Sequence, residues 1–212
     1  MELFEATKKN DINQVIELLK QPNVNVNHQG LFQYEKNGET VERTYTSLHI
    51  ACKEGFTQIA TLLLNDTRTD LNKPHNFGGT PLYVACAFGK TDIVQLLLND
   101  KRVHNVNQQN REGCTPFYIA CQFGHLDVVK LLMSDHRVDF LLQREGGFVP
   151  FYVACSHGQA EVVEFLLSDE RVDINKQEDD GCTPFYIASQ QGHANVIKLL
   201  LKLASRSFQW IL

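Results

Sequence analysis

A repeated motif dominates the sequence. Five ten-residue segments resemble one another: TSLHIACKEG, TPLYVACAFG, TPFYIACQFG, VPFYVACSHG and TPFYIASQQG. They begin at Thr46, Thr80, Thr115, Val149 and Thr183, so the start-to-start spacings are 34, 35, 34 and 34 residues. Each is followed by an apolar run such as IATLLL and then by a link rich in Val, Asp and Asn. The N-terminal segments LFEATKKN and INQVIELLK form a degenerate sixth copy. A period of this length predicts a stack of small supersecondary units.

Each copy predicts two helices. Thr accepts a hydrogen bond from an otherwise unpaired backbone N–H at a helix start, and Pro suits the first helical position. A glycine ends the first helix, where a left-handed residue is favoured, at positions 55, 89, 124, 158 and 192, and Asn10 takes this place in the first copy. The second helix carries apolar residues at helical spacing, as in Ile59, Leu62 and Leu63. Because so small a helix pair cannot bury its own apolar face, we expect a solenoid.

The motif resembles the ankyrin repeat, whose signature is T-P-L-H-x-A in a period of about 33 residues. The resemblance covers roughly residues 2 to 204, although the His of the signature is retained only at His49. It implies an all-α ankyrin-repeat solenoid of about six helix–turn–helix repeats with β-hairpin loops. It also implies binding of other proteins through hairpin tips and the concave face of the first helices. We predict one domain over residues 1–212, with repeats at about 2–27, 46–72, 80–107, 115–141, 149–175 and 183–204, a hairpin insertion at 28–45 and a tail at 205–212.

Composition limits the classes of partner. The formal net charge is −5, and no run of Lys and Arg is longer than two. We therefore expect no nucleic-acid binding and no anionic membrane surface as a target. No apolar run approaches the length of a membrane span. The N-terminus MELFEATKKNDINQ lacks the features of a signal peptide, so we expect a cytoplasmic protein.

Four of the six cysteines, Cys52, Cys86, Cys121 and Cys155, recur at the repeat period. Stacked helices lie about 8–10 Å apart, whereas a disulfide needs Cα atoms within about 4.4–6.8 Å. We therefore expect a ladder of buried thiols. His125 follows Cys121 by four residues, but no four-ligand zinc set is present. We expect no metal, no cofactor and no catalytic residue, and hence no enzyme.

One link is much longer than the others. Eighteen residues separate Asn27 from Thr46, where later copies have seven. The segment contains Asn37-Gly38, a strong signal for a tight hairpin turn, flanked by strand-favouring side chains. We predict an extended β-hairpin between repeats one and two. The alternative is a flexible insertion, which a surface loop tolerates at small entropic cost.

Aromatic side chains at variable positions are the candidates for partner binding. The residues just before the first-helix glycine and those before Thr-Pro face the binding surface in ankyrin repeats. Apolar patches there mark interfaces, and aromatic anchors dominate binding energy. The alternative is local packing of Phe88 against Phe123. With two hairpin residues added, the predicted set is Phe32, Tyr34, Phe77, Phe88, Arg111, Phe123, Phe148 and His157.

Two further patterns concern stability. Asp-x-Arg follows four of the second helices, at Asp66, Asp100, Asp135 and Asp169. We expect solvated charge pairs that order the loops, since exposed pairs contribute below about 1 kcal/mol each. Val149 replaces a capping Thr, and Leu141 replaces the Asn of the neighbouring links. These two losses predict a weak point in the array.

The favoured function is a non-enzymatic protein–protein interaction module, expected to be monomeric. One alternative is a structural unit that self-assembles through the apolar tail, which contains Phe208, Trp210, Ile211 and Leu212. A fold-back of that tail as a cap is the preferred structural interpretation. Another alternative is a regulatory part of a larger multidomain protein. The sequence does not identify the partner.

Overall fold

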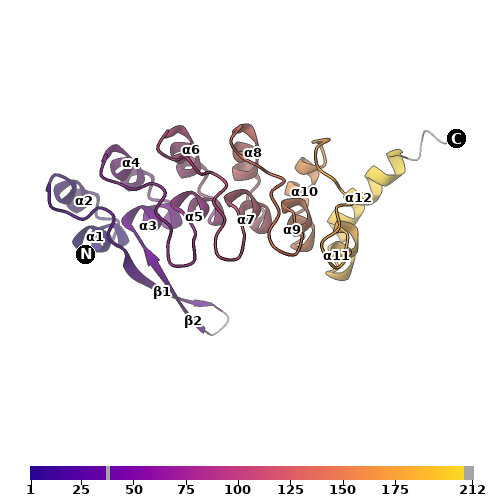
Figure 1. Cartoon of the computed structure of the whole chain (residues 1–212), viewed down its shortest axis with the longest axis horizontal. Helices are drawn as coiled ribbons and strands as arrows, with labels where there is room; N and C mark the ends of the chain where they lie inside the picture. The colour runs from indigo at the N-terminus through magenta and orange to yellow at the C-terminus, as the bar shows by residue number, and fades with distance from the viewer. Residues whose placement is uncertain (37–38, 208–212) are drawn as a thin grey trace. The chain divides into compact units, whose positions relative to one another are not determined.

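The computed structural model describes residues 1–36 and 39–207, and it leaves the side chains of residues 34–36, 39 and 203–207 undescribed. Within those residues the chain forms helix pairs and one pair of strands, in two compact units, Met1–Arg111 and Glu112–Leu212 (Figure 1). The predicted helical solenoid is confirmed. The turn at Asn37-Gly38 and the apolar tail from Phe208 lie outside the described residues.

The first unit contains three helix pairs and the hairpin. Its first helices pack side by side in one row, α1 with α3 and α3 with α5. Its second helices pack in a second row, α2 with α4 and α4 with α6. The elements are α1 (Glu2–Lys8), α2 (Ile12–Leu19), β1 (Gly30–Lys36), β2 (Glu39–Tyr45), α3 (Ser47–Glu54), α4 (Thr57–Asn65), α5 (Pro81–Ala87) and α6 (Thr91–Asn99).

The second unit repeats the arrangement with three more pairs. Here α7 packs on α9 and α9 on α11, while the second helices form their own row. The elements are α7 (Pro116–Phe123), α8 (Leu126–Ser134), α9 (Pro150–Ser156), α10 (Ala160–Leu166), α11 (Pro184–Gln190) and α12 (Ala194–Ser207).

The helix boundaries follow the predicted capping residues. The Thr80 and Thr115 side chains accept from the backbone N–H groups of Tyr83 and Tyr118. Thr46 and His49 form a reciprocal capping box at the start of α3. The first helices are followed by residues with positive φ at glycines 55, 89, 124, 158 and 192, and Asn10 has the same conformation with a φ of 54°. Val149 has the backbone angles of the Thr caps but makes no side-chain bond.

Small buried residues fill the space beneath the first helices. Cys52, Cys86, Cys121 and Cys155 have no exposed surface, as do the alanines that precede them. Burial raises the pKa of each of these thiols well above its usual value. A buried thiol of this kind is a packing residue, as the periodic recurrence predicts.

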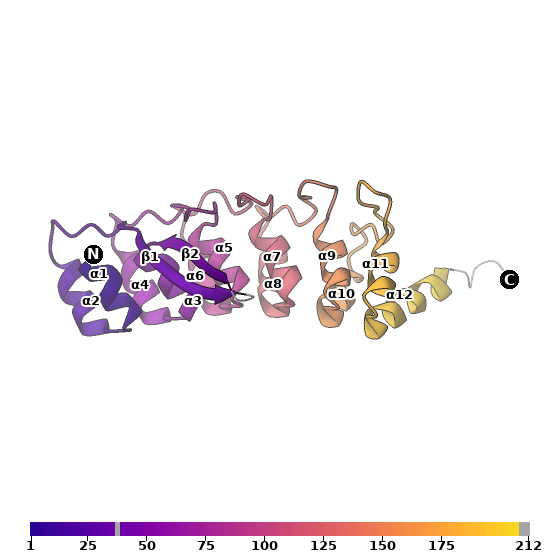
Figure 2. The ribbon, with the colours of Figure 1, turned by 90° about the horizontal axis from the view of Figure 1, so that it is seen from below.

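The inserted segment forms the predicted antiparallel hairpin. The register pairs Gly30 with Tyr45, Phe32 with Arg43 and Lys36 with Glu39. The strand β2 contacts α3, and Figures 1 and 2 both place the hairpin beside the helices of the first unit. A side chain at Gly30 would meet the ring of Phe4 at 2.5 Å, so glycine permits the hairpin to approach α1.

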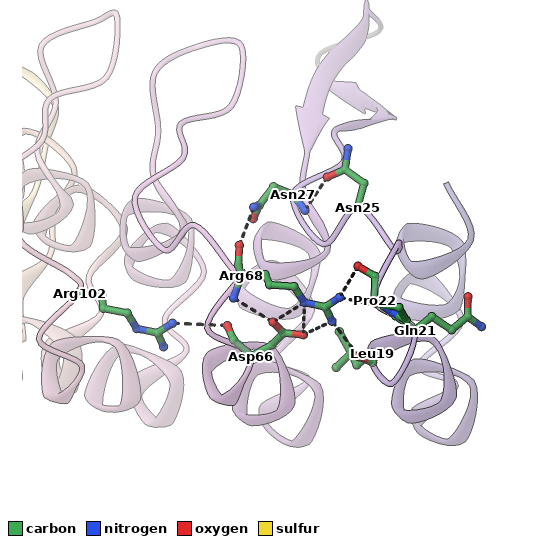
Figure 3. A network of polar contacts seen from close by, with 8 residues as sticks. All are labelled: Leu19, Gln21, Pro22, Asn25, Asn27, Asp66, Arg68 and Arg102. Carbon is green, nitrogen blue, oxygen red and sulfur yellow. Dashed lines mark hydrogen bonds and ion pairs between the residues drawn. The ribbon is translucent and has the colours of Figure 1, made fainter.

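The Asp-x-Arg motifs make more contacts than the sequence suggests (Figure 3). Arg68 pairs with Asp66, and its guanidinium also donates to the carbonyl oxygens of Leu19, Gln21 and Pro22 in the preceding repeat. Arg102 likewise pairs with Asp100 and reaches the carbonyls of Leu64 and Asp66. These arginines therefore satisfy the last carbonyls of a neighbouring helix and join adjacent repeats, so the expectation of merely solvated pairs is incomplete.

Candidate partner-binding surface

The hairpin of the first unit is anchored at its base by hydrogen bonds. The Asn76 side chain accepts from Thr44 N at 3.1 Å, and Asn76 N donates to Thr44 Oγ1 at the same distance. Asn76 also donates from Nδ2 to the Glu42 carbonyl, and Gln29 donates to the Pro74 carbonyl at 2.9 Å. Strand β2 is thereby tied to the loop that precedes α5. The hairpin is an ordered element, and the alternative of a flexible insertion is wrong for its described residues.

The two faces of the hairpin differ in character. Tyr45 is buried, and its ring lies 5.6 Å from that of Phe32 on the same face. The opposite face carries the hydrogen-bonded pair Gln33 and Glu42 and the exposed Leu31. The alternation of side chains along a strand places Arg43 on the face of Phe32 and Tyr45, toward the helices.

Two guanidinium groups flank the ring of Phe77. The Arg43 Cζ lies 3.6 Å from the ring centroid, and the Arg111 Cζ lies 5.9 Å from it. Phe77 remains 37% exposed, so part of the ring is accessible to a partner. A guanidinium stacked on a ring uses its face and leaves its N–H donors directed outward in its plane.

A second cation lies between two rings nearby. The Lys53 Nζ is 4.8 Å from the ring of Phe32 and 5.1 Å from that of Phe88, so α3 connects the hairpin to α5. Lys53 also pairs with Glu54 at 2.5 Å. Phe88 is 43% exposed. Together these side chains form what we call the hairpin surface: Phe32, Arg43, Lys53, Phe77, Phe88 and Arg111.

A cluster of aromatic rings lies behind the hairpin surface. His49 is fully buried, stacks on Tyr45 at 5.5 Å and lies 5.8 Å from His75. Its ring nitrogens contact Thr46 and the Gly79 carbonyl. Burial, with repulsion from His75, lowers the pKa of His49 to about 3. Burial, with the nearby Arg43, lowers the pKa of His75 to about 4. Both rings are neutral at pH 7, and they support the hairpin base as packed, hydrogen-bonded groups.

The second unit carries its own candidates. Phe123 is 52% exposed and lies 6.3 Å from His125. His157 is exposed, and its Nε2 hydrogen-bonds to the Gln122 side chain of α7 at 3.3 Å. Phe148 is only half-buried, but it packs edge-on against Tyr152 and lies under the Arg144 guanidinium.

The structure gathers the predicted residues into groups within each unit. It joins Phe32, Phe77, Phe88 and Arg111 in the hairpin surface, and it joins His157 to Gln122, the residue before Phe123. The side chain of Tyr34 lies outside the described residues. Sequence reasoning missed Arg43 and Lys53, which link the rings. The alternation of the strand could have identified Arg43, because it lies two residues before the apolar Tyr45.

Over the described residues, no group of three or more His, Cys, Asp or Glu side chains is placed to hold a metal ion. None of the helices in that part of the chain is long and apolar enough to cross a membrane.

Comparisons with known proteins agree with this architecture. The helix pairs, left-handed glycines and Thr-Pro caps define a helical-repeat protein with protruding loops. The family model described as "Ankyrin repeats (3 copies)" matches residues 3–107, 48–144, 102–178 and 136–208. The chain belongs to the ankyrin-repeat family. A solved structure, described as the crystal structure of EF0377, an ankyrin repeat protein, is similar at 27% identity and a TM-score of 0.75, over 94% of this chain and 96% of that one. No curated protein matches the sequence.

Proposed function

We propose that this chain is a non-enzymatic, cytoplasmic protein-binding module, and that residues 1–212 act as one ankyrin-repeat domain. Ankyrin repeats are generally protein–protein interaction modules, which supports the class of function. The partner is engaged through the hairpin and the first-helix face, which the family fold makes concave. The buried cysteines suit a reducing compartment.

The observation that carries the proposal is Phe77, an accessible ring with two guanidinium groups from different elements close to it. Arg43 comes from the inserted hairpin and Arg111 from the loop after α6, so the surface depends on the insertion. Aromatic and arginine side chains are the most frequent binding hot spots. Over the described residues, neither Arg43 nor Arg111 forms an ion pair with a carboxylate. A partner segment with apolar and acidic side chains suits such a surface.

Affinity capture with matched variants tests the proposal. The chain and its Phe185→Ser variant should enrich the same partner from a lysate of the source cells, because Phe185 is equally exposed, at 41%, but lies on α11. The double variant Phe77→Ser/Phe88→Ser should lose that partner while its thermal midpoint changes little. Retention of every enriched protein by the double variant would exclude the hairpin surface as the binding site.

A second candidate function is self-association through the last repeat. Tyr186 is 53% exposed, whereas the equivalent Tyr83, Tyr118 and Tyr152 are 8%, 2% and 6% exposed. Phe185 and Leu201 are exposed on the same helix pair. Light scattering at two protein concentrations, with Tyr186→Glu as the comparison, separates a monomer from an oligomer formed by this face. A monomeric mass at both concentrations would eliminate this candidate.

A further inference from the structure

The second unit contains an apolar pocket of about 210 Å³. It opens between the link that follows α8 and the link that follows α10. Its walls are mainly apolar side chains, and its rim carries Arg171, Asp173 and Lys176. The walls include Phe140, Leu141, Val149, Phe151, Leu166 and Val172. Pockets lined by apolar side chains with a few polar groups at the rim are typical of small-molecule sites.

The first unit shows how such a space is normally closed. Asn72 donates from Nδ2 to the Arg102 carbonyl at 2.7 Å, which ties its link to the link of the next repeat. In return, the Arg102 guanidinium donates back to carbonyls of the preceding repeat. Asn27 and Arg68 make the same two connections one repeat earlier. Each pair of adjacent links in this unit is therefore joined in both directions.

Neither of these two hydrogen-bonded connections forms, over the described residues, between the two links that line the pocket. Leu141 occupies the place of Asn72, and an apolar side chain cannot donate to the Arg171 carbonyl. Over the described residues, the Arg171 guanidinium hydrogen-bonds only to Asp169, and it lies over the Phe140 ring at 4.4 Å. Phe140 in turn packs on Phe117 of α7, which fixes the pocket wall.

A further residue that differs from the repeat consensus, Val149, also lines the pocket. Val149 replaces the capping Thr and contributes its methyl groups to the pocket wall. The two substitutions, Leu141 for Asn and Val149 for Thr, thus each remove a polar contact and add apolar lining. Because protein interiors are close-packed, an apolar space left open to solvent at this interface is a candidate ligand site.

The rim indicates the chemistry of the ligand. The Asp169 carboxylate engages Nε and Nη2 of Arg171, which leaves Nη1 available. Lys176 forms no ion pair with the described residues. Asp173, the one acidic group of the rim, accepts from the Asn175 backbone N–H. An anionic group at the mouth can therefore receive N–H donors from two cations, as carboxylates do from Arg and Lys.

The pocket volume limits the ligand to a small molecule. A cavity of about 150 Å³ holds a benzene molecule, so this pocket fits an aromatic ring with a short chain. We propose that the pocket between these two links binds a small apolar monocarboxylate, with its hydrocarbon part against Phe140, Leu141 and Val149 and its carboxylate at Arg171 and Lys176. This binding does not depend on a protein partner.

The test uses hydrocinnamate, an aromatic ring joined by a short chain to a carboxylate, with the full chain. Two-dimensional amide NMR should show saturable shifts at Leu141, Val149 and Val172. Hydrocinnamyl alcohol and phenylpropylamine, which carry the same ring, should bind at least about tenfold more weakly. No saturable shifts at these amides, or tighter binding of the amine, would overturn the assignment.

Two variants separate ligand binding from folding. Leu141→Asn restores the missing connection to the Arg171 carbonyl, so it should reduce affinity at least about tenfold while the melting temperature stays the same or rises. Lys176→Gln should weaken hydrocinnamate binding but not binding of the alcohol. Lys73→Gln is the matched control, because Lys73 holds the same place in the repeat within the first unit. Unchanged affinity in both Leu141→Asn and Lys176→Gln would exclude this pocket.

Discussion

Acidification between pH 7 and pH 5 should destabilise the protein through two buried histidines. Folding lowers the pKa of His49 to about 3 and that of His75 to about 4, from the ordinary histidine pKa of 6.5. The unfolded chain therefore binds more protons below pH 6.5, and the free energy of unfolding falls as the pH falls. Each ring accounts for a loss of about 2 kcal/mol between pH 7 and pH 5, so both together reach an upper limit of about 4 kcal/mol.

Urea unfolding at the two pH values measures this loss. His75→Asn is the informative variant, because Asn110 holds the same place in the next repeat and an Asn side chain can still accept from the Phe77 backbone N–H. The variant should lose about half of the pH dependence. The pKa values of Asp66, Asp100 and Asp135 are lowered by their arginine partners, so those carboxylates lose their contribution only in more acidic solution. A wild-type free energy of unfolding that is the same at pH 7 and pH 5 would refute the reasoning.

Three further predictions concern stability and binding. Val149→Thr should stabilise the protein by about 0.5–2 kcal/mol in urea unfolding, because the backbone already has the geometry of a cap; a neutral or negative result would mean that the Val149 methyl groups pack well enough to offset the missing bond. Arg102→Ala should lower the free energy of unfolding by about 1–2 kcal/mol, because the carbonyls of Leu64 and Asp66 lose their donor. Arg171→Ala is the comparison, and a loss of stability in Arg102→Ala no greater than in Arg171→Ala would contradict the role assigned to the contacts between repeats. Phe88→Ser with Phe123→Ser should abolish partner binding while the thermal midpoint changes little, because both rings are largely exposed; a collapse in stability of several kcal/mol would identify them as core residues.

The regular part of the fold could be predicted because its signals are local. Thr80 and Thr115 cap the helices that they precede, and Gly55 and Gly124 adopt the left-handed conformation that their positions indicate. The hairpin was predictable for the same reason, since the Asn37-Gly38 signal and its strand-favouring neighbours are local features of the sequence. Periodicity predicted the burial of the cysteines in the same way.

The contacts between repeats could not be predicted in this way. Arg68 and Asp66 are two residues apart, and their pairing is readable from the motif, but the carbonyls that Arg68 reaches belong to residues more than forty positions earlier. Asn72 gives no local sign that it binds the Arg102 carbonyl thirty residues later. For the candidate binding surface, the aromatic residues were predicted individually, whereas the stacking of Arg43 on Phe77 required the position of the hairpin.

Residues that depart from the repeat consensus therefore have a different role from the periodic residues. Periodic residues explain why the helix pairs stack, and any ankyrin-repeat chain would need equivalents of them. The inserted hairpin adds Arg43 and Phe32 to a surface that the other links do not build. From the sequence, Leu141 and Val149 each predict a local loss of stability, and in the structure both line the same apolar pocket. Both substitutions lie at the interface between the links that follow α8 and α10. The loss of stability and the open pocket therefore have the same physical origin. Restoring Asn at position 141 should therefore close the pocket and strengthen the array together, whereas a pocket unrelated to the missing connection would remain open.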